Sequence, residues 1–209
     1  MRTRIKFCGC RSVEDALLAV ECGADAIGMI FAESSRRITL ETAEAIGRAL
    51  PAYVTPVGVF SNAEREQIEQ AVRAVPGLVA QLHGDESAAF ASSLTVRNMK
   101  TIHVASEDSA ADLNERAAAY ADCDLLLDTS AGGQRGGTGM VFPWEAAADL
   151  VRRRRVVVAG GLKPENVGEC VRMLRPFGVD VCSGVETNGK KDAEKMRAFV
   201  KAVRDADAA

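Results

Sequence analysis

The sequence predicts a single α/β domain, a (β/α)8 TIM barrel with eight parallel strands, and three observations support this prediction. Short β-type runs alternate with helical segments along the whole chain, and eight such pairs can be counted. The connections are short, and no Pro/Gly/Ser-rich linker divides residues 1–209. A chain of 209 residues is long enough for one well-packed core but short for two. Regular alternation favours a parallel sheet, and eight units favour a closed barrel.

The first four units are delimited by cap and turn residues. Ser12 can cap the first helix, which is expected to end at Gly23, and Pro51 stops the second helix. Asn62 is predicted to cap the third helix, and Pro76-Gly77 closes it. The expected strands are 5–8, 24–31, 55–60 and 78–82, and the expected helices are 12–23, 40–50, 62–76 and 86–93.

The last four units repeat the pattern as far as the C-terminal helix. The alanine-rich segment 110–121 predicts a packing helix that can be short or irregular, and Pro143 suits the first turn of the following helix. The expected strands are 100–104, 123–127, 156–159 and 178–182, and the expected helices are 110–120, 144–153, 164–174 and 192 onward.

Composition and charge indicate a small-molecule partner. The net charge of −3 shows no basic excess for nucleic acid or an anionic membrane. No apolar run approaches the ~20 residues of a membrane span, and the first residues do not resemble a secretory signal. We therefore expect a cytoplasmic protein that binds neither nucleic acid nor membrane.

The six cysteines are expected to be reduced thiols that hold no metal. They are scattered in mostly apolar contexts typical of buried free cysteine. Cys8 and Cys10 form a C-x-C pair, but no second Cys or His pair completes a zinc spacing.

Polar and glycine-rich segments follow the predicted strands, at the end of the barrel where enzymes of this fold place their active sites. Glycine turns present backbone amides that bind anions, and the loops after the seventh and eighth strands commonly hold a phosphate. The sequence therefore predicts a phosphorylated ligand at Gly160-Gly161 and Ser183-Gly184. The other strand-end segments are 8–10, 34–37, 81–85, 128–129 and 136–139 (Gly136-Gly137-Thr138-Gly139).

Motifs in order along nearly the whole chain resemble those of the phosphoribosylanthranilate isomerase family of tryptophan biosynthesis. They include Ile-Lys-Phe-Cys-Gly at 5–9, Gly-Ala-Asp-Ala-Ile-Gly at 23–28, Gln-Leu-His-Gly-Asp-Glu at 81–86, Leu-Leu-Asp-Thr at 126–129, Ala-Gly-Gly-Leu at 159–162 and Ser-Gly-Val-Glu at 183–186. The resemblance implies an Amadori rearrangement that needs no cofactor. An acid protonates the furanose oxygen of the substrate, and a base removes the C2 proton of the resulting Schiff base.

By motif match, Cys8 would be the base and Asp128 the acid. Arg36, spaced between Ser34 and Ile38 as in the family, would bind the anthranilate carboxylate. His83 is more consistent with a structural imidazole or a polar wall contact to the substrate than with a proton carrier.

Alternation along the strands adds a hypothesis about the barrel interior. Lys6 points to the same side as Cys8, and Asp180 lies on the eighth strand, which adjoins the first in a closed barrel. We expect a Lys6–Asp180 ion pair beneath the thiol that favours the thiolate, with an outward-pointing Lys6 as the alternative. Glu186 follows a glycine turn and is expected to help begin a short phosphate-binding helix.

Some residues depart from the family pattern, and two other functions stay open. Cys10 stands where an aliphatic residue is usual, Pro143 replaces a common aspartate, and Cys182 replaces a common serine. The related isomerase of histidine biosynthesis uses two carboxylates, whereas the first strand here ends in a thiol. A non-catalytic phosphosugar-binding barrel is the second alternative. The sequence does not distinguish a monomer from a homodimer.

Overall fold

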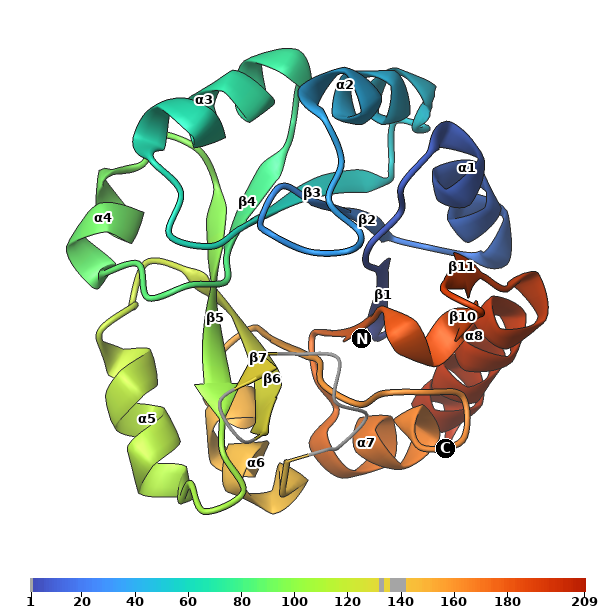
Figure 1. Cartoon of the computed structure of the whole chain (residues 1–209). Helices are drawn as coiled ribbons and strands as arrows, with labels where there is room; N and C mark the ends of the chain where they lie inside the picture. Colours follow the sequence, from blue (N-terminus) through green and yellow to red (C-terminus); the bar gives the residue numbers. More distant parts are fainter. Residues whose placement is uncertain (1, 132–133, 136–141) are drawn as a thin grey trace.

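The computed structural model describes residues 2–131, 134–135 and 142–209, in which eight parallel strands close into a barrel (Figure 1). The strands pair in the order β5-β4-β3-β2-β1-β9-β8-β6, and pairing of β5 with β6 closes the ring. The predicted fold class is therefore confirmed. The barrel strands are β1 (Arg4–Phe7), β2 (Ala26–Ile30), β3 (Thr55–Phe60), β4 (Val79–Leu82), β5 (Asn98–Val104), β6 (Asp124–Ala131), β8 (Val156–Val158) and β9 (Gly178–Val181).

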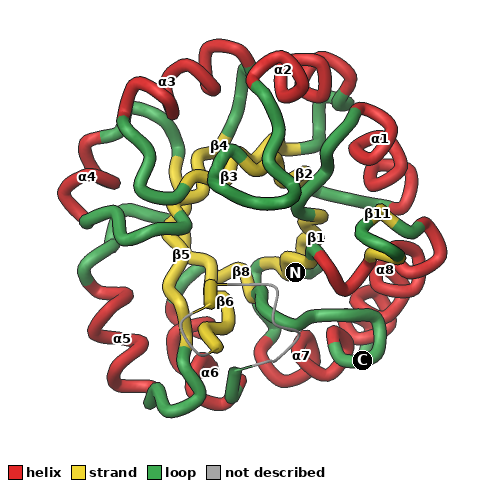
Figure 2. Tube along the Cα trace, viewed as in Figure 1, coloured by secondary structure: helices red, strands yellow, loops and turns green. Residues whose placement is uncertain are grey.

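Helices surround the strand ring on its outside (Figure 2). Their apolar faces pack on the outer surface of the barrel and form one continuous core with it. Within the described residues, the helices are α1 (Val13–Cys22), α2 (Leu40–Ala49), α3 (Arg65–Ala74), α4 (Ala88–Ser93), α5 (Ala110–Ala118), α6 (Trp144–Arg153), α7 (Val167–Leu174) and α8 (Ala193–Ala208).

The inside of the barrel is more polar than the layer between strands and helices. A small apolar cluster of Val57, Met99, Leu126 and Ala159 is separate from the main core. Lys6 and Asp180 are buried, at 4% and 7% exposure. Charged groups at this depth need partners, so the barrel interior is built around an ion pair as well as around apolar packing.

Helix caps account for most of the element boundaries. The Ser12 side chain accepts a hydrogen bond from the Asp15 N–H and caps α1, which ends at Gly23 with a φ of 106°. Both predictions are confirmed. The alanine-rich α5 is regular, and Ser109 and Asp112 form a capping box at its start.

The prediction that Asn62 caps the third helix is wrong. Helix α3 begins at Arg65, and Glu64 caps it in a capping box with Gln67. Asn62 has a φ of 51°, and its side chain accepts a hydrogen bond from the Asp85 N–H at 2.7 Å. Asparagine tolerates this left-handed conformation, so Asn62 ties the loop after β3 to the loop after β4 instead of starting a helix.

After β9, the 3-10 helix η1 (Ser183–Val185) leads into a small hairpin of β10 (Glu186–Thr187) and β11 (Lys190–Lys191). The hairpin turn is Asn188-Gly189, with φ values of 51° and 72°. Both values are positive, which is the requirement of a two-residue hairpin turn and the reason for an Asn-Gly pair there. Strand β7 (Gln134–Arg135) pairs with the end of β6. No helix in the described ranges is long and apolar enough to cross a membrane.

Candidate active site

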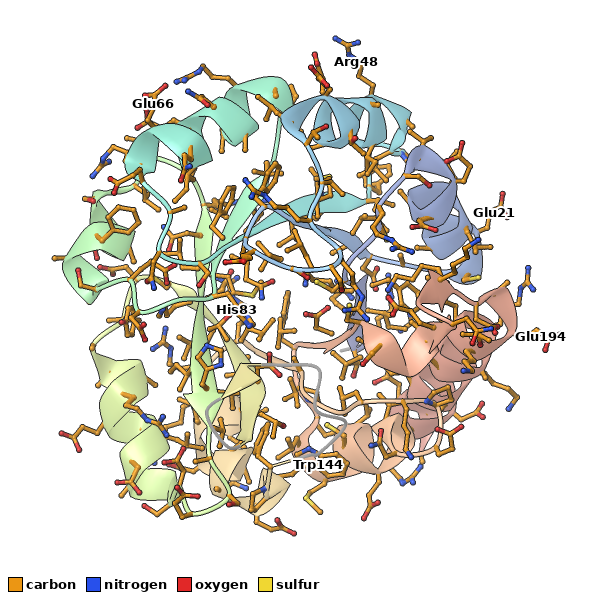
Figure 3. All side chains as sticks on the ribbon, in the orientation of Figure 1. Glu21, Arg48, Glu66, His83, Trp144 and Glu194 are labelled. Atoms are coloured by element: carbon orange, nitrogen blue, oxygen red, sulfur yellow. The ribbon has the colours of Figure 1, made fainter. Side chains whose placement is uncertain are left out.

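A pocket of ≈ 260 Å³ opens at the ends of the barrel strands and is lined by the predicted catalytic residues and by predicted substrate-binding residues. The loops after β1, β2, β4, β8 and β9 contribute to it together with Asp128 on β6, because the carboxyl ends of parallel strands meet at one rim. Figure 3 shows His83 toward the middle of the ring, whereas Glu21 and Arg48 point outward from the helices. The predicted residues in the lining are Cys8, Arg36, His83, Asp128, Gly160, Gly161, Ser183 and Gly184.

Cys8 lies one residue past β1, and its side chain is directed into this pocket. Its N–H donates to the Val181 carbonyl at 2.9 Å, and the side chain is nearly buried, at 7% exposure. A Cβ on Gly28 would lie 2.7 Å from the Cys8 sulfur, so the glycine on β2 makes room for the thiol. Position and packing therefore hold the sulfur at a defined place on the rim.

Below Cys8, the expected ion pair is present. Strands β1 and β9 pair with Lys6 opposite Asp180, and Lys6 Nζ donates to Asp180 Oδ2 at 2.8 Å. Burial favours the neutral lysine, but Asp180 and the Cys8 sulfur outweigh it and raise the pKa of Lys6. Lys6 is therefore a fixed cation beneath the thiol, and the hypothesis of the buried ion pair is confirmed.

A second sulfur changes the electrostatics expected for Cys8. Its hydrogen bond with Cys182, together with burial, raises the pKa of Cys8 well above the usual range, although Lys6 acts in the opposite direction. The same hydrogen bond, together with Lys191 and Arg36, lowers the pKa of Cys182. Of the two thiols, Cys8 therefore holds its proton more strongly, and Cys182 loses its proton more readily. Lys6 lowers the pKa of Cys8, as expected, but the hydrogen bond with the neighbouring sulfur and burial have the larger effect.

Asp128, on β6, is 7% exposed. Burial and the Asp180 charge raise the pKa of Asp128 to about 7, against the opposing effects of the Thr129 N–H and Lys6. A carboxyl group with this pKa is partly protonated at neutral pH and can give up a proton. His83 Nε2 lies 3.5 Å from Asp128 Oδ2.

Two histidines form the wall beside Asp128. The His83 and His103 rings meet edge to face with centroids 4.9 Å apart, and His83 Nδ1 lies 3.1 Å from Thr101 Oγ1. His83, His103 and Asp128 could also offer one ligand atom each to a metal ion, since these atoms lie within 4.8 Å of one another. His103 was not predicted as a site residue, because a histidine inside a strand gives no signal of its own.

The glycine turns after β8 and β9 pack so closely against neighbouring residues that there is no room for a side chain at Gly160 or Gly184. Gly160 and Gly161 have φ values of 82° and 62°, and a Cβ on Gly160 would lie 2.3 Å from Thr129 Oγ1. A Cβ on Gly184 would lie 2.0 Å from the Leu162 carbonyl oxygen. The two predicted phosphate-binding turns are thus packed together at one side of the pocket. The predicted segment 136–139 lies outside the described residues.

Arg36 reaches the pocket, but its guanidinium group is held by Glu186. Arg36 Nε donates to Glu186 Oε1 at 3.0 Å, and Arg36 Nη2 lies 2.6 Å from Oε2. Burial opposes the charge of Glu186, yet hydrogen bonds from Arg36 and Lys191 outweigh it and lower the pKa of Glu186. Glu186 follows the short helix η1 and does not begin it, so the expectation for Glu186 is corrected.

Lys191 is a site residue that sequence reasoning missed. Its side chain is 1% exposed, and its ammonium group donates to Glu186 Oε1 at 2.9 Å and to the Cys8 carbonyl at 2.6 Å. It also donates to the Cys182 carbonyl at 3.2 Å. The Asn188-Gly189 pair is a typical hairpin turn and could have indicated a hairpin here. Such a hairpin would bring the chain back to the barrel rim at Lys191.

Comparisons with known proteins agree on one family. The family model of N-(5'-phosphoribosyl)anthranilate isomerase matches residues 5–202. A Pseudomonas aeruginosa protein of that name is 46% identical over 205 residues, covering 96% of this chain and 95% of that protein. A Listeria monocytogenes protein of the same name is 37% identical over 201 residues, covering 96% and 98%.

The chain belongs to the N-(5'-phosphoribosyl)anthranilate isomerase family. Solved members have the same fold: the Thermotoga maritima enzyme is 38% identical, with a TM-score of 0.88, and the alignment covers 97% of this chain and 99% of that one. Another solved family structure is a complex with reduced 1-(o-carboxyphenylamino)-1-deoxyribulose 5-phosphate, at 38% identity and a TM-score of 0.85, covering 97% and 99%. The predicted family is confirmed, and a phosphorylated ligand is known for one of its members.

Proposed function

We propose that the chain catalyses the Amadori rearrangement of N-(5-phosphoribosyl)anthranilate to 1-(2-carboxyphenylamino)-1-deoxyribulose 5-phosphate in tryptophan biosynthesis. The observation that carries the proposal is one pocket lined by a thiol, a carboxyl group of raised pKa and two glycine turns. Membership of the family supports it. A cytoplasmic location belongs to the same proposal, since the six thiols are free.

Asp128 would open the sugar ring. Its carboxyl group, with a pKa of about 7, donates a proton to the furanose oxygen as the C1–O bond breaks. The nitrogen lone pair of the substrate forms the C=N bond of a protonated Schiff base at the same time. His83, 3.5 Å from the Asp128 carboxylate, is placed to contact the substrate or to stabilise the charge left on Asp128.

Cys8 would remove the C2 proton. Because Cys8 and Cys182 are hydrogen-bonded, transfer of the shared proton to Cys182 produces the Cys8 thiolate without any change in the total charge of the pair. The fixed Lys6 cation lies beneath the thiolate and stabilises it. Loss of the C2 proton gives an enamine, which tautomerises to the ketose.

Binding is assigned to groups at the rim. The turns at Gly160-Gly161 and Ser183-Gly184 would hold the phosphate, whose charge suits closely spaced backbone amides. The guanidinium of Arg36 would bind the anthranilate carboxylate while Glu186 holds its Nε and Nη2 atoms. The substrate thus lies across the pocket with its reacting carbons between Cys8 and Asp128.

The reaction needs no external oxidant or cofactor. C1 is reduced and C2 is oxidised within one molecule, and each proton removed is balanced by one that is donated. Acid and base side chains supply all of this chemistry.

The test is an assay of substrate fluorescence with the purified chain. We expect phosphoribosylanthranilate to be consumed with formation of the ketose phosphate, and the aminoaldose substrate of the histidine pathway to react much more slowly. Faster turnover of the histidine-pathway substrate would favour that isomerase instead. Thermal stabilisation by the substrate without turnover would identify a binding protein.

A further inference from the structure

The ends of strands β1 and β9 place two sulfur atoms next to each other. The last register pair of the two strands is Phe7 with Val181, and Cys8 and Cys182 follow directly. The Cys8 N–H still donates to the Val181 carbonyl at 2.9 Å, so the strands stay adjacent at this point. Neighbouring strands lie about 4.8 Å apart, which is within the Cα separation of disulfide-bonded cysteines.

Both side chains are directed to the same side of the barrel rim. Cys8 and Cys182 line one pocket, and their thiols are hydrogen-bonded to each other. A Cβ on Gly9 would lie 2.9 Å from the Cys182 sulfur, so glycine leaves the space that this sulfur occupies. Lys191 holds both backbones, since its ammonium donates to the Cys8 and Cys182 carbonyls at 2.6 Å and 3.2 Å.

Of the two sulfurs, Cys182 is the more reactive. It is half-buried, whereas Cys8 is nearly buried. Lys191 and Arg36 lie close enough to lower its pKa, in addition to the hydrogen bond from Cys8. A thiolate near cations and open to a pocket is the form of cysteine that reacts with oxidants.

We propose that Cys8 and Cys182 are a site of reversible oxidation, at which a hydroperoxide converts the two thiols into an intramolecular disulfide. The Cys182 thiolate attacks the peroxide O–O bond, takes one oxygen as sulfenic acid and releases an alcohol or water once the leaving oxygen is protonated. The Cys8 sulfur then attacks the Cys182 sulfur, the S–O bond breaks, and a second water leaves with the Cys8 proton. The two sulfurs lose two electrons in total, and the peroxide gains them.

This disulfide removes the thiol that the proposed reaction uses as its base. Oxidation would therefore stop catalysis, and a thiol reductant would restore it by exchange. The loss of activity rests on the proposed function. Disulfide formation itself does not.

Cys10 is the alternative partner for Cys8, and the structure argues against it. Its side chain is fully buried in the core between barrel and helices, and its thiol lies 3.8 Å from the Phe7 carbonyl. Cys8 is directed into the pocket, on the other side of the strand end. An 8–10 bridge would require the segment to leave its present packing.

The test treats the full chain with hydrogen peroxide and follows intact mass, tryptic peptides and isomerase activity together. We expect a species lighter by two hydrogen atoms, a cross-linked peptide joining Cys8 to Cys182, and a loss of activity of at least about 100-fold that dithiothreitol reverses. The Cys10→Ala variant should behave as the wild type. In Cys182→Ser and Cys182→Ala, the lighter species should be absent, and peroxide should instead add oxygen atoms to Cys8 that dithiothreitol does not fully remove.

Three results would overturn the proposal. They are a peptide joining Cys8 to Cys10, a disulfide between two chains, and the same loss of two hydrogen atoms in Cys182→Ser as in the wild type. If the Cys8–Cys182 peptide forms while full activity persists, the oxidation site stands, and the assignment of Cys8 as base fails. Mass and activity therefore report separately on the oxidation site and on the proposed function.

Discussion

Cys8 lies between a cation that lowers its pKa and a second sulfur that raises it. A lysine beneath a thiol favours the thiolate, and Lys6 is where the strand alternation placed it. The hydrogen bond to the Cys182 sulfur raises the pKa of Cys8 more than Lys6 lowers it, and the same hydrogen bond lowers the pKa of Cys182. The register that places Lys6 beside Asp180 also places Cys8 beside Cys182, but the sequence alone does not show which of the two thiols has the raised pKa.

Alkylation tests this distribution of charge. At neutral pH, iodoacetamide should modify Cys182 before Cys8, because the thiolate is the reactive form. In Cys182→Ser, Cys8 should react at lower pH than in the wild type, since the hydrogen bond that raises its pKa most is lost. Peptide mapping over a pH series measures both. Modification of Cys8 first in the wild type would contradict the assignment.

Asp128 should make the stability of the protein depend on pH. The folded-state pKa of about 7 lies above the ordinary 3.8, so folding favours the protonated form. This contribution is fully present below the unfolded pKa and is lost as pH rises through the folded pKa. The Asp128→Asn side chain stays neutral, so the free energy of unfolding of this variant relative to wild type should be higher at about pH 8.5 than at about pH 5, by roughly 3 kcal/mol.

Urea unfolding at the two pH values measures this difference. Asp205→Asn is the matched control, because that carboxylate is 61% exposed in a surface ion pair. Its effect should stay within about 0.5 kcal/mol at both pH values. Equal effects of Asp128→Asn at both pH values would show that Asp128 has an ordinary pKa.

The β10–β11 hairpin holds a network of ion pairs and hydrogen bonds at the pocket rim. The only sign of this hairpin in the sequence is its Asn188-Gly189 turn. Glu186 joins Arg36 from the loop after β2 to Lys191 on β11, and Lys191 reaches the ends of β1 and β9. Arg36, which its motif predicts to bind the anthranilate carboxylate, lines the pocket. Its partner could not be predicted, because the two residues are 150 positions apart.

Glu186→Gln should destabilise the protein by roughly 3 kcal/mol, since it leaves the buried Lys191 ammonium without its charge partner. Denaturant unfolding measures this. Glu44→Gln on α2 is the control, because its pair with Arg48 is exposed and should contribute less than about 0.5 kcal/mol. Similar losses in the two variants would show that the hairpin network adds little to stability.

For the whole molecule, the alternation of strands and helices was sufficient to predict the fold, because each unit has a clear apolar pattern and a cap or turn at its ends. The error at Asn62 arose because asparagine is common both at helix N-caps and in left-handed turns. Its hydrogen bonds with Glu86 and Asp85, which only the structure shows, favour the turn. The single domain over 1–209 stays a prediction.

Oligomeric state belongs to this scale as well. A dimeric Thermotoga maritima relative has been converted to monomers. Among the described residues, the exposed large apolar side chains are Leu17 on α1, Leu40 on α2, Tyr53 before β3 and Met173 on α7. Light scattering distinguishes the two states, because it gives the mass of one chain for a monomer and of two chains for a dimer.

We propose that Cys8 and Asp128 act as base and acid in one isomerase pocket. The most direct measurement is the steady-state kinetics of phosphoribosylanthranilate conversion by Cys8→Ala and Asp128→Asn, with binding of the ketose phosphate product measured on the same samples. We predict that each variant loses at least about 100-fold in kcat and keeps product affinity within about threefold of wild type. Wild-type turnover in either variant would contradict the account.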